Sequence, residues 1–368
     1  MNSDFLSQVI AKRIRPDVQA MHAYVVQDAS GMLKLDAMEN PYSLPPELQS
    51  QLGARLAGAA LNRYPSTEPQ QLQAALRTYT GLGADCGLIL GNGSDELISL
   101  ISTACSLPGA TVLAPVPGFV MYGISAQLAQ MQFVGVPLTP DFELDEAAML
   151  AAIAEHQPAI TWLAYPNNPT ANAWSKASIT RIIAAVAAVQ GIVVMDEAYQ
   201  PFATHSWLDE LQAQPALHQH VLIMRTLSKF GLAGIRLGFL MGAQRLVAEI
   251  DKVRPPYNVN VLTAECALFA LEHSDEFARQ AAQICSERTR LLAALTLWKN
   301  CHAYPSQANM ILLRVPDAAQ TFMQLKQRGV LIKNVSGLHP LLANCVRLTV
   351  GTPNENTAML AALEAVLA

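Results

Sequence analysis

Between residues 87 and 242, short apolar runs alternate with longer stretches that have the apolar spacing of helices. The runs predict strands at residues 87–92, 111–116, 133–138, 159–166, 191–198, 220–229 and 237–242. The stretches between them predict helices, of which the clearest cover residues 96–107, 124–131 and 178–188. Strands that are apolar throughout and separated by helices are typical of a mostly parallel sheet covered on both faces. The sequence therefore predicts an α/β fold of the doubly wound kind.

The pattern changes after Pro255 and Pro256. It predicts one long helix over residues 261–297, then strands at 308–315, 329–335 and 345–350, and a closing helix from Glu355. Three units are expected from this change and from the length of 368 residues. They are an N-terminal arm that joins the small domain in part (1–45), a large α/β domain (46–260) and a small α+β domain (261–368).

The distribution of charge and the spacing of the cysteines exclude several classes of partner and of bound group. The net charge is −5 and the Lys and Arg residues are dispersed, which disfavours binding to nucleic acid or to an anionic membrane. The chain begins MNSDFLSQVIAKRIRPD, with charges where a signal peptide needs an apolar centre, and no apolar run is long enough to span a bilayer. A cytoplasmic protein is expected. The six cysteines include no CxxC pair, so neither a disulfide framework nor a metal site is expected.

Two glycines, Gly91 and Gly93, stand where a predicted strand ends and a helix begins. Backbone amides at a helix start, with the positive end of the helix dipole, can bind a phosphate. An ordinary glycine turn with Ser94 or Asp95 as the helix cap is the plainer interpretation. Asp95 and Glu96 would also repel a phosphate unless a cation compensates. The glycine motifs of dinucleotide-binding and P-loop proteins are missing from the sequence, which argues against a nicotinamide dehydrogenase.

Two charged residues follow apolar runs that predict buried strands. Asp196 ends one run, where a carboxylate needs a cation or a hydrogen-bond donor. Lys229 ends the next run, where removal from water would lower its pKa and free the amine as a nucleophile. Taken singly, each has a plainer interpretation, a structural carboxylate and a solvated surface lysine.

The glycine turn, the acid and the lysine are all expected at one edge of one sheet, where α/β proteins bind their ligands. A pyridoxal phosphate site needs a phosphate cradle, an anion that keeps the ring nitrogen protonated, and an amine that forms a Schiff base. The three predicted features together supply these groups.

The sequence also resembles the histidinol-phosphate aminotransferases, which are fold type I pyridoxal phosphate enzymes of the class II aminotransferase group. The resemblance runs from about residue 33 to 352 and rests on nine motifs in the family's order. These are LDAMENP (35–41), NRYP (62–65), GNGSDE (91–96), PGFVMY (117–122), YPNNPT (165–170), DEAY (196–199), RTLSK (225–229), GLAGIRLGF (231–239) and VRLTVGT (346–352). It implies the fold type I architecture, a mostly parallel central sheet flanked by helices with a smaller C-terminal α+β domain.

The resemblance implies the residues that hold the cofactor. Lys229 would bind pyridoxal 5'-phosphate covalently, Asp196 would contact its ring nitrogen, and Asn168 and Tyr199 its ring oxygen, with Lys229, Asp196 and Tyr199 as the catalytic set. Phe119 would stack on the ring, where relatives usually carry Tyr. The phosphate would be bound by Ser94, the Asp95 amide, Ser228, Arg236 and, from the neighbouring subunit of a homodimer, Tyr64.

Substrate contacts are implied in the same way. Arg347 would bind the substrate carboxylate, and Tyr24, Lys333 and Asn168 would complete the substrate site. Plainer roles are a turn for Asn168, core packing for Phe119 and a surface ion pair for Arg347. Two features depart from the family. Lys333 stands where relatives often carry Arg, and Lys229 and Arg236 are seven residues apart where many relatives have eight.

The implied activity is the transfer of an amino group between L-histidinol phosphate and 2-oxoglutarate, giving imidazole acetol phosphate and glutamate in histidine biosynthesis. An aromatic amino acid aminotransferase and a threonine-phosphate decarboxylase are alternatives on the same scaffold. A non-catalytic module of a transcription regulator is an alternative from another class. It would need a DNA-binding segment, for which the roughly 30 residues before the first motif leave no room.

Overall fold

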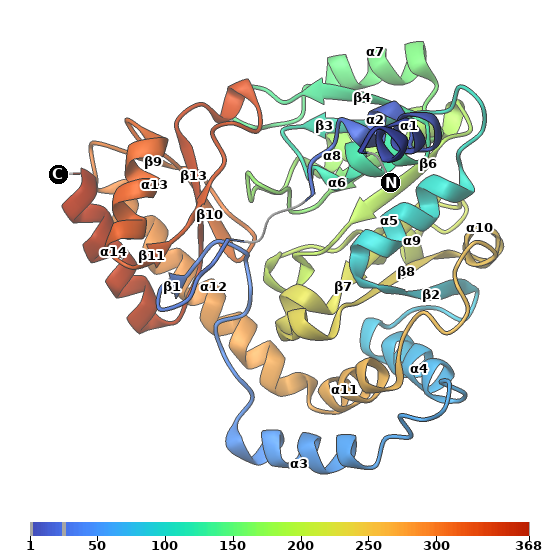
Figure 1. The fold of residues 1–368 in the computed structure, drawn as a ribbon, viewed down its shortest axis with the longest axis horizontal. Coiled ribbons are helices and arrows are strands. Elements are labelled where there is room, and N and C mark those ends of the chain that lie inside the picture. Colours follow the sequence, from blue (N-terminus) through green and yellow to red (C-terminus); the bar gives the residue numbers. More distant parts are fainter. Residues whose placement is uncertain (1–2, 24–26, 368) are drawn as a thin grey trace.

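The computed structural model describes residues 3–23 and 27–367. Its centre is a seven-stranded sheet in the order β2-β8-β7-β6-β5-β3-β4 (Figure 1). The strands are β2 (Cys86–Asn92), β3 (Thr111–Val116), β4 (Gln132–Pro137), β5 (Ile160–Ala164), β6 (Ile192–Asp196), β7 (Val221–Thr226) and β8 (Leu237–Ala243). Strands β3 to β7 are parallel, and β8 is antiparallel to both of its neighbours, β7 and β2. The predicted α/β fold with a mostly parallel sheet is confirmed.

Helices cover both faces of this sheet. One face packs against α5 (Gly93–Ala104), α6 (Met121–Leu128) and α10 (Gln244–Asp251). The other packs against α4 (Glu68–Thr80), α7 (Glu146–His156), α8 (Lys176–Ala188), α9 (Trp207–Ala213) and α11 (Val261–Glu272). Side chains alternate between the two faces along each strand. In β6, for example, Val194 joins the first core while Val193 and Met195 join the second, so the strand is apolar throughout.

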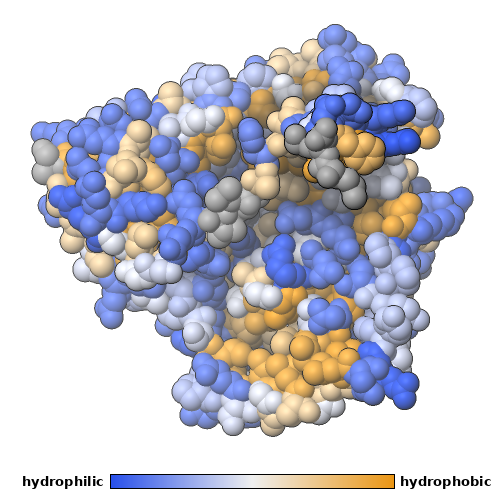
Figure 2. Space-filling model, in the orientation of Figure 1, coloured by the Kyte–Doolittle hydropathy of each residue, from blue (hydrophilic) through white to orange (hydrophobic). Residues whose placement is uncertain are grey.

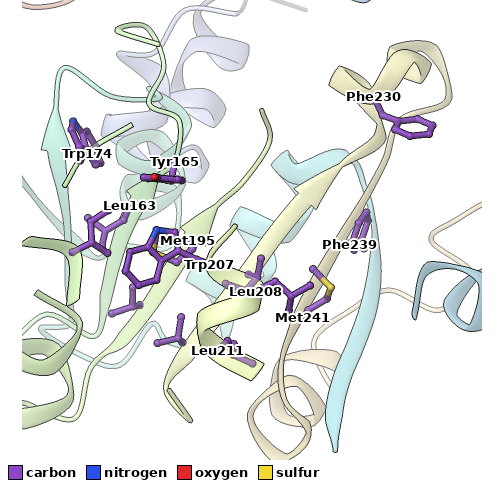
Figure 3. Close-up of a cluster of buried hydrophobic side chains, with 14 of the residues drawn as sticks. Leu163, Tyr165, Trp174, Met195, Trp207, Leu208, Leu211, Phe230, Phe239 and Met241 are labelled. Atoms are coloured by element: carbon purple, nitrogen blue, oxygen red, sulfur yellow. The ribbon is translucent and has the colours of Figure 1, made fainter. Parts of the chain in front are cut away.

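The second of these cores is shown in Figure 3. Leu163 of β5 and Met195 of β6 belong to this core together with Leu208 and Leu211 of α9. All four side chains are buried. Burial of a leucine or methionine side chain contributes about 1.5–3 kcal/mol, so the sheet edge that carries the polar strand ends rests on a well-packed interior.

A smaller sheet lies beside the large one, in the order β12-β13-β10-β9, with antiparallel pairing (Figure 1). Its strands are β9 (His302–Ala303), β10 (Met310–Arg314), β12 (Lys333–Asn334) and β13 (Cys345–Thr349), and its helices are α12 (Ser274–Thr296), α13 (Ala318–Gln327) and α14 (Pro353–Leu367). The N-terminal part of the chain contributes β1 (Leu33–Lys34), which pairs with β11 (Val330–Leu331). Leu35 and Met38 join the same core. The division at residues 45 and 260 stays a prediction.

Two sequence-based predictions about this region are wrong in detail. The helix expected over residues 261–297 is interrupted at His273, whose backbone (φ −114°, ψ 31°) is not helical. As a result α11 packs on α4 and on α3 (Pro46–Ala57), next to the large sheet. Helix α12 reaches both cores: Phe277 joins the core of the large sheet, and Ile284, Leu291 and Leu295 join the smaller core. The strand expected at residues 329–335 is divided between β11 and β12, which lie in different sheets.

The ends of other elements also differ from the prediction: α5 begins at Gly93 rather than Glu96, and α6 covers 121–128 rather than 124–131. Near the N-terminus, α1 (Ser3–Arg13) and α2 (Pro16–Gln19) lie beside α6 (Figure 1). Between them Arg15 donates to the carbonyl oxygens of Gln127 and Leu128, at 3.0 and 2.8 Å. Within residues 3–23 and 27–367, no helix has the length and apolar character needed to cross a membrane.

Candidate active site

The ends of β2, β6 and β7 lie at one edge of the large sheet. Because β2 and β7 are both antiparallel to β8, they run in the same direction and end at the same edge. A cavity opens there. It is lined by the predicted residues Ser94, Asp95, Phe119, Asn168, Asp196, Tyr199, Ser228, Lys229 and Arg236, and also by Met38, Tyr122, Ala164, Pro166, Ala198 and Thr226.

The start of α5 forms a close backbone cradle against β8. Gly93 has φ +76°, which favours glycine, and a Cβ at this position would lie 2.7 Å from Arg236 Nη2. A Cβ on Gly238 would lie 2.7 Å from both the carbonyl carbon of Gly93 and the nitrogen of Ser94. Glycine at both positions therefore keeps open the approach to the first amides of α5, where an anion is favoured.

Hydroxyl and guanidinium groups surround this helix start. Arg236 donates from Nη1 to Ser228 Oγ at 3.4 Å and from Nη2 to Asp95 Oδ2 at 3.2 Å. The Ser228 hydroxyl also accepts a bond of 3.0 Å from Thr226 Oγ1. These groups are hydrogen-bond donors, and the Arg236–Asp95 pair is partly exposed, so an incoming phosphate can compete for the guanidinium.

The sequence predicted that Asp95 and Glu96 would repel a phosphate unless a cation compensates. The structure gives each of the two carboxylates a different partner. Asp95 faces Arg236, as required. Glu96 needs no compensation from Arg236, because its carboxylate accepts bonds of 2.7 Å from the Asn92 amide and from Asn258 Nδ2. Glu96 therefore caps the turn.

Asp196, the last residue of β6, is 5% exposed. Its Oδ2 accepts a 2.6 Å hydrogen bond from the Tyr122 hydroxyl, and its Oδ1 accepts a 3.0 Å bond from the Ala198 amide. Burial raises the pKa of Asp196 to about 6, and these two bonds oppose the rise. A cationic partner in the cavity would stabilise the carboxylate in its charged form.

Lys229 lies in the turn after β7, within η2 (Ser228–Leu232), and its Nζ donates to the carbonyl oxygen of Ala37 at 2.9 Å. Burial, and after it the charge of the nearby Arg347, lowers the pKa of Lys229 to about 8. More of the amine is therefore neutral at physiological pH than in an exposed lysine, as a nucleophile requires.

Asn168 and Arg347 connect the two sheets across the cavity. Arg347, on β13, donates from Nη1 to Asn168 Oδ1 at 2.7 Å and from Nη2 to the carbonyl oxygen of Asp36 at 2.9 Å. Tyr199 is buried beside them, and burial raises the pKa of its hydroxyl. The Lys229 Nζ lies 6.0 Å from the centroid of the Tyr199 ring.

Two predicted residues, Tyr64 and Lys333, do not line the cavity, and Arg347 reaches its edge through the bond to Asn168. Tyr64 is 76% exposed and stacks on Tyr257, with ring centroids 4.7 Å apart, at another surface. Lys333 lies on β12 directly across from Arg347, so both side chains emerge on the same face of the small sheet, but Lys333 does not line the cavity. Tyr24 lies outside the described residues.

Sequence reasoning missed two polar side chains that line the cavity, Tyr122 and Thr226. Tyr122 bonds to Asp196, and Thr226 bonds to Ser228. Tyr122 belongs to the PGFVMY motif and Thr226 to the RTLSK motif. Their places in these motifs were the only sequence signal that they belong to the site. The carbonyl oxygen that accepts the bond from Lys229 belongs to Ala37 of the LDAMENP motif. Because it is a backbone atom, the residue type at this position gives no sign of the contact.

The donor set fits pyridoxal phosphate. The glycine cradle and the hydroxyl and guanidinium groups suit a phosphate. The buried carboxylate of Asp196 suits a protonated ring nitrogen, and the amine of Lys229 suits an aldehyde. The aromatic ring of Phe119 and the side chain of Tyr199 line the space between them.

Comparisons with known proteins agree with this chemistry. The family model for aminotransferase class I and II matches residues 30–363. The chain is 64% identical over 362 residues, 98% of its length, to a histidinol-phosphate aminotransferase of Methylibium petroleiphilum, of which 96% is covered. It is equally identical, over 96% of its length and 97% of the relative, to a histidinol-phosphate aminotransferase of an Acidovorax strain.

The fold is similar to that of a solved histidinol-phosphate aminotransferase from Sinorhizobium meliloti in complex with pyridoxal-5'-phosphate. The TM-score is 0.82 at 22% identity, with 96% of this chain and 97% of the other covered. At this identity the likeness shows the fold.

Proposed function

Because the chain belongs to the aminotransferase class I and II family, we propose that it transfers an amino group between L-histidinol phosphate and 2-oxoglutarate. The products are imidazole acetol phosphate and glutamate. The predicted family and the predicted pyridoxal phosphate cofactor are confirmed. The observation that carries the substrate is the 64% identity, over nearly the whole chain, to relatives that carry this activity in their names.

In this proposal Lys229 holds the cofactor covalently, Asp196 pairs with the ring nitrogen, and Asn168 and Tyr199 approach the ring oxygen. Phe119 packs on the ring, and the first turn of α5 with Ser228 and Arg236 binds the phosphate. When bound, pyridoxal phosphate supplies an electron-withdrawing ring that stabilises negative charge on the carbon next to the substrate amine. The support is that all these residues line one cavity.

The proton transfers belong to Lys229. With substrate bound, the Lys229 amine would take the proton from the substrate α-carbon, because its lowered pKa leaves a useful fraction neutral. Asp196 holds a proton on the ring nitrogen as a buried anion, stabilised by the Tyr122 hydroxyl and the Ala198 amide.

Arg347 must serve two different anions. Histidinol phosphate carries a phosphate ester where an amino acid has its α-carboxylate, whereas 2-oxoglutarate and glutamate carry carboxylates. A guanidinium can bind either group with two parallel hydrogen bonds. Asn168 Oδ1 and the Asp36 carbonyl hold the guanidinium of Arg347 at the cavity. Lys333, beside Arg347 on the same face of the small sheet, and Tyr24 are the further substrate contacts in this proposal.

A direct assay separates the proposal from its alternatives. The purified holoenzyme is supplied with 2-oxoglutarate and, in separate reactions, histidinol phosphate, phenylalanine or threonine phosphate, and glutamate and carbon dioxide are measured. We expect rapid glutamate formation with histidinol phosphate and no carbon dioxide. Faster turnover of phenylalanine would favour an aromatic aminotransferase, and carbon dioxide from threonine phosphate would favour the decarboxylase.

The proposal includes a homodimer with shared sites, in the cytoplasm, where amino-acid biosynthesis takes place. Tyr64 and Tyr257 form an exposed aromatic stack, and the neighbouring Leu61 and Leu262 are 68% and 39% exposed. Apolar surface gathers over α11 in this region (Figure 2). An apolar patch of this kind favours a protein partner, and a second copy of the chain would cover it. Tyr64 would then reach the phosphate cradle of the partner subunit.

A further inference from the structure

Tyr122, in the first turn of α6, contacts both Asp196 and the buried Trp162 of the large sheet. Its hydroxyl donates to Asp196 Oδ2 at 2.6 Å, and the residue is 2% exposed. Its ring stacks on Trp162, with centroids 4.6 Å apart and only 6° between the planes. Phe119 meets the Tyr122 ring edge-on at 5.7 Å. Because Trp162 is fully buried on β5, this stack fixes the position of the hydroxyl.

The hydrogen bonds of Asp196 leave it able to act in the cavity. Tyr122 bonds to one carboxylate oxygen and the Ala198 amide to the other. Each oxygen of a carboxylate can accept about two hydrogen bonds, so both keep a position for a further donor. Two donors, one on each oxygen, also restrict the rotation of the carboxylate. Asp196 is therefore oriented before any ligand binds.

The charges around Asp196 make the Tyr122 bond important. Burial raises the pKa of Asp196 to about 6, and the Tyr122 hydrogen bond is the largest influence that opposes this rise. The Tyr122 hydroxyl has a pKa raised well above its usual value by burial, so it stays a donor at physiological pH. Further charged groups near the carboxylate or lining the same cavity are Asp95, Glu197, Lys229 and Arg236.

We propose that Tyr122 is a positioning residue for the cofactor: its hydroxyl, held by the Trp162 stack, keeps Asp196 ionised and oriented so that the shared proton stays on the ring nitrogen. This inference rests on the proposed function, because it needs pyridoxal phosphate in the cavity. Without the hydroxyl, the proton moves from the ring nitrogen toward the Asp196 carboxylate, and the ring withdraws electrons less strongly.

The test is the ¹⁵N NMR signal of the ring nitrogen in holoenzyme loaded with ¹⁵N-labelled pyridoxal phosphate. In the wild type we expect the signal of a protonated nitrogen. In Tyr122→Phe we expect a shift toward the neutral form, with the ratio of the two forms changed about tenfold, as one pKa unit on the carboxylate corresponds to a factor of ten. Amino transfer should slow by a similar factor.

Tyr165→Phe is the matched control. It removes a hydroxyl from a tyrosine that is also buried, at 6% exposure, but that does not line the cavity, so its ¹⁵N signal should equal that of the wild type. If Tyr122→Phe does not fold, Trp162→Phe carries the test. That variant keeps the hydroxyl but weakens its support, and we expect a smaller shift in the same direction.

Identical ¹⁵N signals in the wild type and the variant would overturn the role of Tyr122 while leaving the proposed function intact. A wild-type protein that takes up no pyridoxal phosphate would instead overturn the proposed function.

Discussion

Burial acts in opposite directions on the two ionisable groups at the centre of the site. It raises the pKa of Asp196 to about 6 and lowers that of Lys229 to about 8, because a low-dielectric surrounding disfavours the charged form of each. A ligand that offers Asp196 a cation and Lys229 a carbonyl carbon offsets the cost of burying both groups. Both residues could be found from the sequence because each ends an apolar run. The role of Tyr122 could not, because its bond to Asp196 joins residues 74 positions apart.

At the residue scale, Arg347→Lys tests the anion clamp. Lysine keeps the charge but loses the planar fork and the bond from Nη1 to Asn168, so kcat/KM should fall about 10- to 100-fold for histidinol phosphate and for glutamate alike. Steady-state kinetics of both half-reactions measure the loss. Arg314→Lys, on the neighbouring strand β10, is the control: Arg314 bonds to Tyr304 rather than to Asn168, so this variant should keep wild-type kinetics. A loss for one substrate alone would contradict the shared role of Arg347.

At the scale of elements, β8 decides how the site is assembled. Gly238 on β8 pairs with Gly91 of β2 and with Thr226 of β7, so one strand brings the phosphate turn next to the lysine turn. The apolar runs predicted these strands. They could not reveal that β8 is antiparallel, because a fully buried strand is apolar in either direction. The division of residues 329–335 between two sheets was hidden because no glycine or proline interrupts the run after Gly329.

Gly238→Ala tests the cradle formed by β8 and α5. A methyl group there would lie 2.7 Å from backbone atoms of Gly93 and Ser94, so the helix start must shift. We expect the affinity for pyridoxal phosphate to fall at least about tenfold, the cost of roughly one lost hydrogen bond to a charged group. Equilibrium titration of the apoenzyme measures this.

Gly242→Ala is the control for this change. It crowds Leu222 at the other end of the same strand, also at 2.7 Å, far from the cradle. It should lower the thermal stability but leave the affinity for the cofactor unchanged. Equal losses of affinity in both variants would mean that the cradle has no special role.

At the scale of the whole molecule, the site draws on both sheets and on the N-terminal segment. Arg347 comes from the small sheet, Lys229 from the large one, and Ala37 and Asp36 bond to them from the segment after β1. The order of motifs along the sequence indicated that such distant segments belong to one site. It could not give the packing of α11 on the large sheet, because the pattern of residues 261–297 reads as one helix and the interruption at His273 has no glycine or proline signal.

The proposed dimer predicts complementation between subunits. A homodimer of the Lys229→Ala variant and a homodimer of the Tyr64→Ala variant should each have impaired activity. In a mixed dimer of the two, one site carries both defects and the other carries neither, so activity should return. Mixing Lys229→Ala with Asp196→Ala is the control, because both residues belong to the same subunit's site and no intact site can form. Activity assays after subunit exchange measure the result, and failure of the first pair to recover would argue against Tyr64 acting across the interface.

The central claim is that Lys229 carries the cofactor and releases it to an amino donor. Borohydride reduction of the holoenzyme, followed by peptide mapping with mass spectrometry, tests this claim most directly. We predict the cofactor on Lys229, its loss when histidinol phosphate is added before reduction, and its retention when phenylalanine is added instead. Attachment to a different lysine, or labelling of Lys229 that histidinol phosphate does not change, would contradict the account.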